Sequence, residues 1–108
     1  MIDLSVVVPL FNESESINEL DAMIHVILKT SSLNYELIYI DDGSTDGSWT
    51  QIKKLASNNS KILGLRFLKN YGKSMALSAG FKKSSGRVVI TMDSDLQDDP
   101  KEIIPLYK

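Results

Sequence analysis

No cysteine occurs among the 108 residues of this chain, and this absence excludes several kinds of site. Without thiols the chain can form neither a disulfide framework nor a thiolate metal site. Histidine is almost as scarce, since His25 is the only one. It falls within a predicted helix, where a partly buried or solvent-facing position is favoured over a catalytic one.

Long apolar runs and a large net charge are missing as well. No run approaches the roughly 18 consecutive apolar residues of a membrane-spanning helix, so we expect this chain not to cross a membrane. Residues 1–9 have no basic region before their apolar run, so we expect no signal peptide. The formal net charge of −2 provides no general attraction to nucleic acid or to an anionic membrane surface. We therefore predict a cytoplasmic protein that would reach the cytoplasmic face of a membrane only through parts not in this chain.

Apolar and charged residues make up 43% and 24% of the chain, which is ordinary for one soluble globular domain. Apolar and β-branched runs predict buried strands at residues 4–10, 36–40, 62–68 and 88–92. Amphipathic stretches follow each of them and predict helices. Short connections between strands and helices require parallel crossovers. The predicted fold class is therefore α/β, with a Rossmann-like, doubly wound parallel sheet in a three-layer αβα arrangement.

The predicted helices have recognisable starts. Asn12 is expected to begin a capping box for the first helix, and Thr45 or Asp46 to cap the second. The third helix, over residues 73–84, carries small residues that would let it approach the sheet closely: Ala76, Ala79 and Gly80. Pro100 is expected to open a fourth helix.

Polar residues gather where the fourth predicted strand ends. Asp93 follows that strand, with Asp95 two positions further along and Gln97 two beyond that. In open α/β sheets, ligands bind just beyond the carboxyl ends of the strands. Carboxylate and amide oxygens are hard ligands suited to Mg2+ or Mn2+, so the spacing predicts a metal site. The alternative is a solvated acidic loop that caps the next helix.

Two further polar clusters follow the first and second predicted strands, at residues 9–13 and 41–44. Asp42 could accept a hydrogen bond from the ring N–H of a nucleobase, and backbone groups near Pro9 could contact the same base. The alternative for Asp42 is a turn and helix cap, and the residues alone leave both interpretations open. A parallel sheet would place all three clusters on one edge, which favours a ligand site.

No glycine-rich phosphate loop of the G-x-G-x-x-G or G-x-x-x-x-G-K-[ST] type follows the first strand. Backbone binding of a dinucleotide pyrophosphate or of ATP is therefore not expected. A metal at Asp93 and Asp95 would have to neutralise a bound diphosphate. Lys73 could add a second positive charge there, or could simply be an exposed lysine.

Four segments in order carry a resemblance to a known family. They read VVVPLFNE, YIDDGSTDGS, NYGKSMALSAG and ITMDSDLQDDP. They resemble the signatures of family 2 glycosyltransferases, which are GT-A fold enzymes that use nucleotide-sugar donors. The last segment is most similar to the polyprenyl-phosphate branch, which includes dolichol-phosphate mannosyltransferases and undecaprenyl-phosphate glycosyltransferases. The resemblance covers essentially the whole chain.

The resemblance implies which residues contact the nucleoside of the donor. Pro9, Phe11 and Glu13 would border the nucleoside, and Asp42 would bind its base. The donor would be a UDP-linked or GDP-linked sugar.

The resemblance also implies a metal-assisted transfer. Asp93, Asp95 and Gln97 would hold Mg2+ or Mn2+ together with the donor diphosphate, with Asp95 as the most direct ligand. The sugar would pass, with inversion, to a polyprenyl phosphate or a growing glycan.

One part of the family pattern has no counterpart in this chain. In the family, the acceptor site and the catalytic base lie in a second half beyond the D-x-D region. We therefore interpret residues 1–108 as the nucleotide-sugar-binding portion of a GT-A domain, with the base downstream of Lys108. We expect this portion alone to transfer no sugar, and its uncovered faces would favour a homodimer.

Two other classes of protein use similar aspartates. Phosphatases of the haloacid-dehalogenase type place D-x-D after an apolar strand, but they require Thr or Val where this chain has Gln97, and that strand comes first rather than fourth. A receiver-like phosphorylation switch would need paired acids after the first strand and a lysine after a fifth strand. Both requirements are unmet in this sequence.

Overall fold

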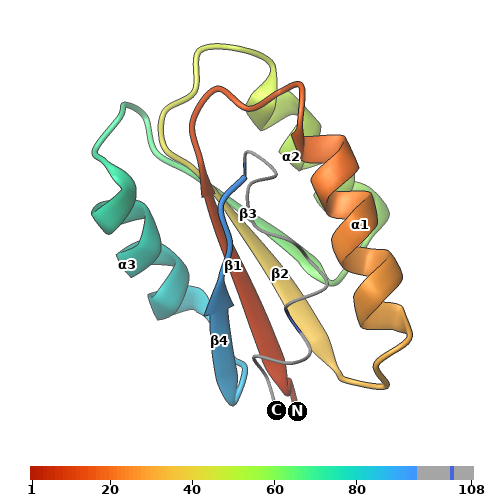
Figure 1. The fold of residues 1–108 in the computed structure, drawn as a ribbon. Helices are drawn as coiled ribbons and strands as arrows, with labels where there is room; N and C mark the ends of the chain where they lie inside the picture. Colours follow the sequence, from red (N-terminus) through yellow and green to blue (C-terminus); the bar gives the residue numbers. More distant parts are fainter. Residues whose placement is uncertain (95–102, 104–108) are drawn as a thin grey trace.

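The structure is a computed structural model that describes residues 1–94 and residue 103. Within that range, strands alternate with helices along the chain (Figure 1). The elements in chain order are β1 Leu4–Leu10, α1 Ile17–Lys29, β2 Tyr35–Asp41, α2 Ser48–Asn58, β3 Ile62–Arg66, α3 Lys73–Lys83 and β4 Val88–Thr91. The helix predicted after Pro100 lies outside the described residues apart from Ile103, which is fully buried.

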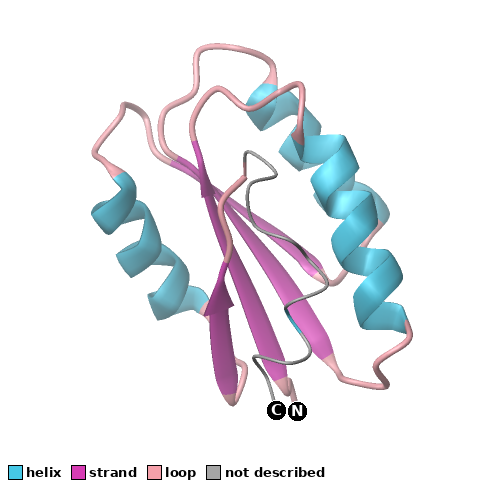
Figure 2. Cartoon of the chain, viewed as in Figure 1, coloured by secondary structure: helices cyan, strands magenta, loops and turns pink. Residues whose placement is uncertain are grey.

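The strands form one parallel sheet in the order β3-β2-β1-β4. Central β1 pairs with β2 along its whole length, from Leu4 opposite Tyr35 to Leu10 opposite Asp41, and with β4 on its other side. Every residue of β1 is buried, as expected for a strand that is covered on both faces. Figure 2 shows α1 and α2 on one face of the sheet and α3 on the other. The predicted α/β class and parallel sheet are therefore confirmed.

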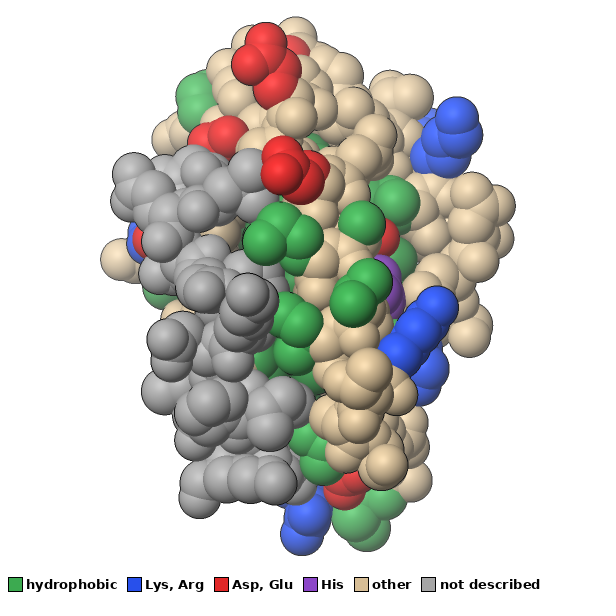
Figure 3. Space-filling model, turned by 45° about the vertical axis from the view of Figure 1, so that its right-hand side comes forward, with side chains coloured by type: hydrophobic (Ala, Val, Ile, Leu, Met, Phe, Trp, Pro, Cys, Tyr) green, Lys and Arg blue, Asp and Glu red, His purple; other side chains and the backbone are tan. Residues whose placement is uncertain are grey.

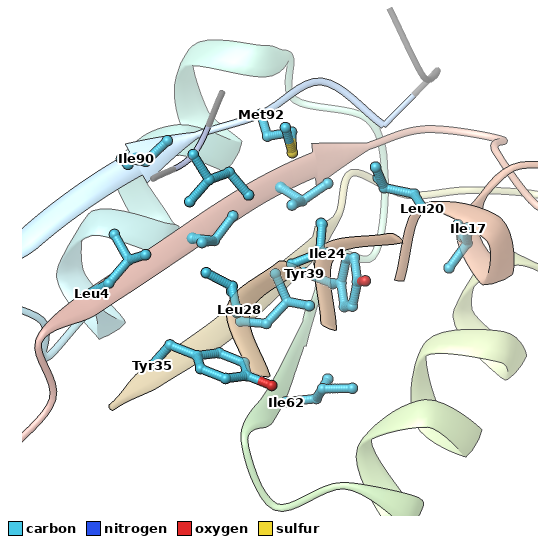
Figure 4. Close-up of a cluster of buried hydrophobic side chains, with 14 of the residues drawn as sticks. Leu4, Ile17, Leu20, Ile24, Leu28, Tyr35, Tyr39, Ile62, Ile90 and Met92 are labelled. Atoms are coloured by element: carbon cyan, nitrogen blue, oxygen red, sulfur yellow. The ribbon is translucent and has the colours of Figure 1, made fainter. Parts of the chain in front are cut away.

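The larger hydrophobic core lies between the sheet and α1. Ile24 and Leu28 of α1 are buried there together with Leu4 and Tyr39 of the sheet (Figure 4). Burial of one side chain of this size contributes roughly 1.5–3 kcal/mol. The apolar stripe of α1 therefore fixes this helix against β1 and β2.

A smaller core holds α3 on the opposite face of the sheet. It joins Ala76 of α3 to Val7, Ile38 and Ile40. A Cβ atom at Gly80 would lie 2.4 Å from Val7 Cγ1 and 2.8 Å from Ile40 Cδ1, which is closer than such atoms can approach. Glycine thus lets α3 lie directly on β1 and β2, as the small residues of this helix predicted.

The helix starts differ from the sequence predictions. Ser16 is the N-cap residue of α1, so the prediction that Asn12 begins a capping box is wrong. The N-cap residue of α2 is Gly47, so neither Thr45 nor Asp46 occupies that position. The physical reason is that the polar groups around Asn12 and Asp46 bond to each other across two loops, as described below.

Two strands are shorter than predicted, since β3 ends at Arg66 and β4 ends at Thr91. β2 ends at Asp41, directly opposite Arg66, so β3 has no strand to pair with beyond that residue. Leu68, the predicted end of the third strand, is accordingly 95% exposed.

The outward surface of α1 is partly apolar. Met23 and Val26 are exposed there and line a shallow hollow with Ala22 and Ile27. Figure 3 turns this side of the molecule forward and shows apolar side chains gathered at the surface. Within the described part of the chain, no helix has the length and apolar character needed to cross a membrane.

A buried polar cluster joins α1 to β2. The Tyr39 hydroxyl donates to Asp21 Oδ1 at 2.6 Å, and His25 Nε2 lies 3.3 Å from the same oxygen. His25 Nδ1 lies 2.7 Å from the Tyr35 hydroxyl oxygen. Burial, followed by the charge of Asp21 and the hydrogen bond to it, raises the pKa of Tyr39 far above its ordinary value. The phenol of Tyr39 therefore stays protonated in the folded protein and serves as a hydrogen-bond donor to Asp21.

Replacing Tyr39 by phenylalanine should make the free energy of unfolding fall less steeply as the pH rises into the alkaline range. A tyrosine in the unfolded chain ionises at about pH 10, whereas Tyr39 stays protonated in the folded protein, so Tyr39 by itself should contribute a fall of about 1.4 kcal/mol per pH unit to the free energy of unfolding above that point. Tyr39→Phe lacks this contribution, and urea denaturation from about pH 9 to about pH 11 measures the difference in slope. Tyr71→Phe, at a tyrosine that is 53% exposed, is the matched control for loss of a phenol hydroxyl. Equal slopes for the parent and Tyr39→Phe would contradict the expectation.

Candidate functional site

A pocket of about 400 Å3 opens at the carboxyl ends of the strands. Its walls come from the ends of β1, β2 and β4 and from the loop between β3 and α3. The lining residues are Pro9, Leu10, Phe11, Glu13, Asp42, Asn70, Gly72, Lys73, Asp93 and Ser94. Six of these were predicted from the sequence, namely Pro9, Phe11, Glu13, Asp42, Lys73 and Asp93. The predicted ligands Asp95 and Gln97 lie outside the described residues.

The end of β1 forms an apolar wall of the pocket. Pro9 and Leu10 are buried at the end of the strand, and Phe11 follows with 42% of its surface exposed. The carbonyl of Leu10 accepts a hydrogen bond from the backbone N–H of Asp42 at 2.9 Å, which keeps the ends of β1 and β2 side by side. An aromatic ring that is half exposed beside two buried apolar residues can contact the flat face of a ligand.

Asp42 holds the opposite wall in place. Its Oδ1 accepts the backbone N–H of Tyr71 at 2.8 Å, and its Oδ2 accepts the backbone N–H of Gly72 at 3.0 Å. Gly72 has a φ of 103° and immediately precedes α3, so the carboxylate fixes the turn from which that helix starts. Each carboxylate oxygen can accept a second hydrogen bond. Asp42 therefore retains the capacity to accept a further N–H.

Gly43 brings the loop after β2 against the loop after β3. Its φ is 77°, and a Cβ atom there would lie 2.3 Å from the carbonyl carbon of Lys69. Only glycine fits this contact, because a side chain would collide with backbone that cannot move aside. The loop that carries Asn70 is thus held by both Gly43 and Asp42.

A charged pair crosses the pocket between α3 and β4. Lys73 Nζ lies 2.6 Å from Asp93 Oδ1, and their side chains are 62% and 39% exposed. Exposed ion pairs contribute little to stability, about 0–1 kcal/mol, so ligand binding can rearrange this pair at small cost. The predicted second positive charge therefore lies beside the first aspartate of the predicted metal motif.

The donor set of that motif suits a divalent cation chemically. Carboxylate oxygens from Asp93 and Asp95 and an amide oxygen from Gln97 are hard ligands of the kind that Mg2+ and Mn2+ prefer. Asp93 is the only one of the three within the described residues, where its carboxylate already attracts the ammonium group of Lys73. Residues 1–94 and 103 contain no group of three acidic or histidine side chains that could hold a metal by themselves.

Sequence reasoning missed a set of polar contacts between the loops that follow β1 and β2. Asp46 provides an example, since it accepts hydrogen bonds from the N–H and hydroxyl of Ser48 and from the N–H of Ser14. Burial raises the pKa of Asp46, but the hydrogen bonds from Ser48 and Ser14 together outweigh burial and hold this pKa below its ordinary value. The bonds from Ser48 are local, but no pattern in the sequence identifies the bond from Ser14, because it joins loops that are 32 residues apart along the chain. Asn70 was missed for a different reason, since it stands in a quoted motif without an assigned role.

A comparison with protein families identifies the family of this chain. The profile of glycosyl transferase family 2 matches residues 5–108. The chain belongs to this family.

A curated relative extends the family assignment. This chain is 44% identical, over 101 residues, to an undecaprenyl-phosphate 4-deoxy-4-formamido-L-arabinose transferase from Aeromonas hydrophila, and the match covers 93% of this chain and 31% of the relative. The similarity to the polyprenyl-phosphate branch of the family is thereby confirmed. The chain spans about a third of the length of this relative.

Solved structures share the fold. The mannosyltransferase PcManGT from Pyrobaculum calidifontis, in complex with GDP-Man and Mn2+, superposes with a TM-score of 0.79 at 22% identity, over 94% of this chain and 30% of that one. TarS 1-349 from S. aureus, in complex with UDP-GlcNAc, superposes with a TM-score of 0.75 at 27% identity, over 96% of this chain and 29% of that one. This family 2 glycosyltransferase chain therefore has the GT-A architecture that its sequence predicted.

The role of Asp42 in holding the loop before α3 can be tested by hydrogen exchange. In Asp42→Asn the amide can accept only one of the two backbone N–H bonds, and its own NH2 group faces the other donor. Exchange of the Tyr71 or Gly72 amide should then accelerate by roughly tenfold, the equivalent of about 1.4 kcal/mol of lost bonding. The Ser85 amide, bonded to Glu36, is the internal control and should not change. Unchanged exchange at both Tyr71 and Gly72 would show that Asp42 does not hold this loop.

Proposed function

We propose that the pocket is the donor site of a glycosyltransferase that transfers a sugar from a nucleotide diphosphate. The observation that carries this proposal is the convergence of groups from separate strand ends in one pocket of about 400 Å3. It combines an apolar wall, a buried carboxylate and an exposed pair of opposite charges. A nucleotide sugar needs these three kinds of contact for its base, its ribose and its diphosphate.

The nucleoside is assigned to the side of the pocket formed by β1 and β2. Pro9 and Phe11 provide apolar surface for the base and ribose. Asp42 is 5% exposed and retains hydrogen-bonding capacity for a ring N–H of the base. Glu13, at the rim, is placed to accept from a ribose hydroxyl. UDP and GDP both offer a ring N–H to such a carboxylate, so both remain candidate donors.

The diphosphate is assigned to the side of the pocket formed by α3 and β4. Lys73 is placed to exchange part of its interaction with Asp93 for the phosphates. Asp93, Asp95 and Gln97 would hold Mg2+ or Mn2+ beside them. When bound, this cation supplies positive charge that stabilises the departing diphosphate. These assignments agree with the GDP-Man and Mn2+ named for the structural neighbour, although that neighbour by itself supports only the fold.

The acceptor is proposed to be a polyprenyl phosphate, with a growing glycan as the alternative. Support comes from the relative that is named as an undecaprenyl-phosphate transferase and is 44% identical to this chain. We infer transfer with inversion, in which the acceptor oxygen attacks the anomeric carbon as the nucleoside diphosphate leaves. The acceptor site and the base are assigned to parts of the protein outside residues 1–108.

Calorimetry with UDP and GDP tests the donor site. One of the two nucleotides should bind in the presence of Mn2+ or Mg2+, and the affinity should fall strongly when EDTA removes the metal, because the diphosphate then faces the carboxylates without a bridging cation. Asp95→Asn should weaken metal-dependent binding by about 1–3 kcal/mol. Affinity that is indifferent to EDTA would eliminate the proposed metal role.

Two controls separate the parts of the donor site. Asp98→Asn removes the same charge one position beyond the motif and should cost less than Asp95→Asn. Uridine or guanosine without metal reports the nucleoside contacts without the diphosphate and should bind more weakly to Asp42→Ala. Nucleoside binding that is equal in parent and variant would leave Asp42 with only its role in holding the loop.

Residues 1–108 alone should bind the donor without transferring the sugar. Positioning of the acceptor can lower a reaction barrier by about 7–11 kcal/mol, and this contribution is lost when the acceptor site is absent. The measurement is product formation from UDP- and GDP-sugars with polyprenyl phosphate or simple sugars as acceptors. Slow hydrolysis of the donor is compatible with the proposal. Turnover like that of a full-length relative would place the base within these 108 residues.

A further inference from the structure

The loop after β1 is bonded to the loop after β2 by a set of short contacts centred on Asn12. The backbone N–H of Asn12 donates to Ser44 Oγ at 2.8 Å. In the other direction, Asn12 Oδ1 accepts the backbone N–H groups of Thr45 at 2.8 Å and of Asp46 at 3.3 Å. We call these contacts, made by residues 12–14 and 44–48, the Asn12 junction.

Neighbouring residues reinforce the Asn12 junction. The backbone N–H of Glu13 donates to Ser48 Oγ at 3.0 Å, and that of Ser14 donates to Asp46 Oδ2 at 3.2 Å. Ser44 is itself anchored, because its N–H donates to the buried carboxylate of Asp41 at the end of β2. The loop after β1 is therefore fixed from the β2 side at three consecutive residues.

Asn12 adopts a backbone conformation that most residues avoid. Its φ is 55°, and among the described residues only Ser32 shares a positive φ without being glycine. Such a conformation costs of order 1 kcal/mol or more and persists where surrounding contacts enforce it. Asparagine tolerates this region better than most side chains, and its short amide reaches nearby backbone N–H groups. One residue thus provides both the turn and the acceptor that holds it.

The turn at Asn12 separates two residues of the pocket wall. Phe11 precedes it and Glu13 follows it, and both line the pocket, whereas Asn12 does not. Glu13 is also bonded to Ser16, whose hydroxyl lies 3.1 Å from Glu13 Oε2 and 2.9 Å from the carbonyl oxygen of Ser94. The position of Asn12 therefore decides where Phe11 and Glu13 lie relative to the strand end that carries Asp93.

We propose that Asn12 is a positioning residue of the donor pocket: its left-handed turn and its amide bonds to the loop after β2 place Phe11 and Glu13 for contact with the nucleoside. This inference rests on the proposed function, since it specifies how that same pocket is held open for its ligand. Asn12 does not touch the ligand in this scheme. Its contribution is to keep the β1 wall in place before the ligand binds, which lowers the ordering cost of binding.

Asn12→Gly separates positioning from stability. Glycine adopts a positive φ without steric cost, so the variant relieves the backbone strain while losing the Oδ1 contacts. Its affinity for UDP or GDP with Mn2+ should fall by about tenfold, the equivalent of roughly one lost net hydrogen bond, whereas its unfolding midpoint in urea should stay close to that of the parent. A merely structural residue would show the reverse, a lowered midpoint with an unchanged affinity.

Two further variants control this experiment. Asn12→Asp keeps the acceptor oxygen and should retain the affinity of the parent to within about twofold, measured at roughly 0.3 M salt so that its added charge is screened. Ser32→Gly relieves the other positive φ of a non-glycine residue, away from the pocket, and should leave the affinity unchanged.

Failure of the inference about Asn12 can be distinguished from failure of the proposed function. If the parent binds neither nucleotide, the proposed function fails. Hydrogen exchange then tests the Asn12 junction by itself, because exchange of the Thr45 and Asp46 amides should accelerate in Asn12→Gly. Unchanged exchange at both amides would overturn the inference. Nucleotide affinity of Asn12→Gly equal to that of the parent, or an equal loss in Ser32→Gly, would overturn it as well.

Discussion

The structure depends on the complete burial of β1. Its backbone pairs with β2 on one side and β4 on the other, and its side chains enter two cores on opposite faces of the sheet. A strand so enclosed meets solvent only at its ends. Because the pairing is parallel, the register that buries Val7 also carries the ends of β2 and β4 to the same edge. The position of the pocket follows from this one constraint.

Most polar groups at that edge hold the edge together. Asp42 binds the turn before α3, and Asn12 binds the loop after β2. Gly43 lets two of these loops touch. Groups that are fixed before a ligand arrives need not be ordered during binding, so each such contact reduces the entropic cost of recognition. These contacts make the edge a rigid frame around the pocket, and the groups that face inward remain available to contact a ligand.

The ion pair of Lys73 and Asp93 is not part of that rigid frame. Both side chains are substantially exposed, and their pairing contributes little to stability. This weakness would suit the binding of a charged ligand, since the ammonium group balances the carboxylate in the free protein and can shift toward another anionic group at small cost. A buried pair would resist that exchange, because separating it would leave an uncompensated charge. The contrast between a rigid side formed by β1 and β2 and an adaptable side formed by α3 and β4 is a property of burial as much as of residue type.

The sequence by itself determined the α/β class, the alternation of strands and helices, and the residues that stand at the strand ends. These features are local, because strand burial and helical stripes follow periods of a few residues and polar side chains mark where each strand stops. Only the tertiary structure decided that β1 is central, that Asp42 bonds to Tyr71 and Gly72, and that Asn12 holds a second loop instead of capping α1. The Asp42 bonds join residues 29 and 30 positions apart, and those of Asn12 join residues 32 to 34 positions apart. Such partners become neighbours only when the sheet has assembled, and their combined bonds then prevail over the local capping pattern that the sequence displays.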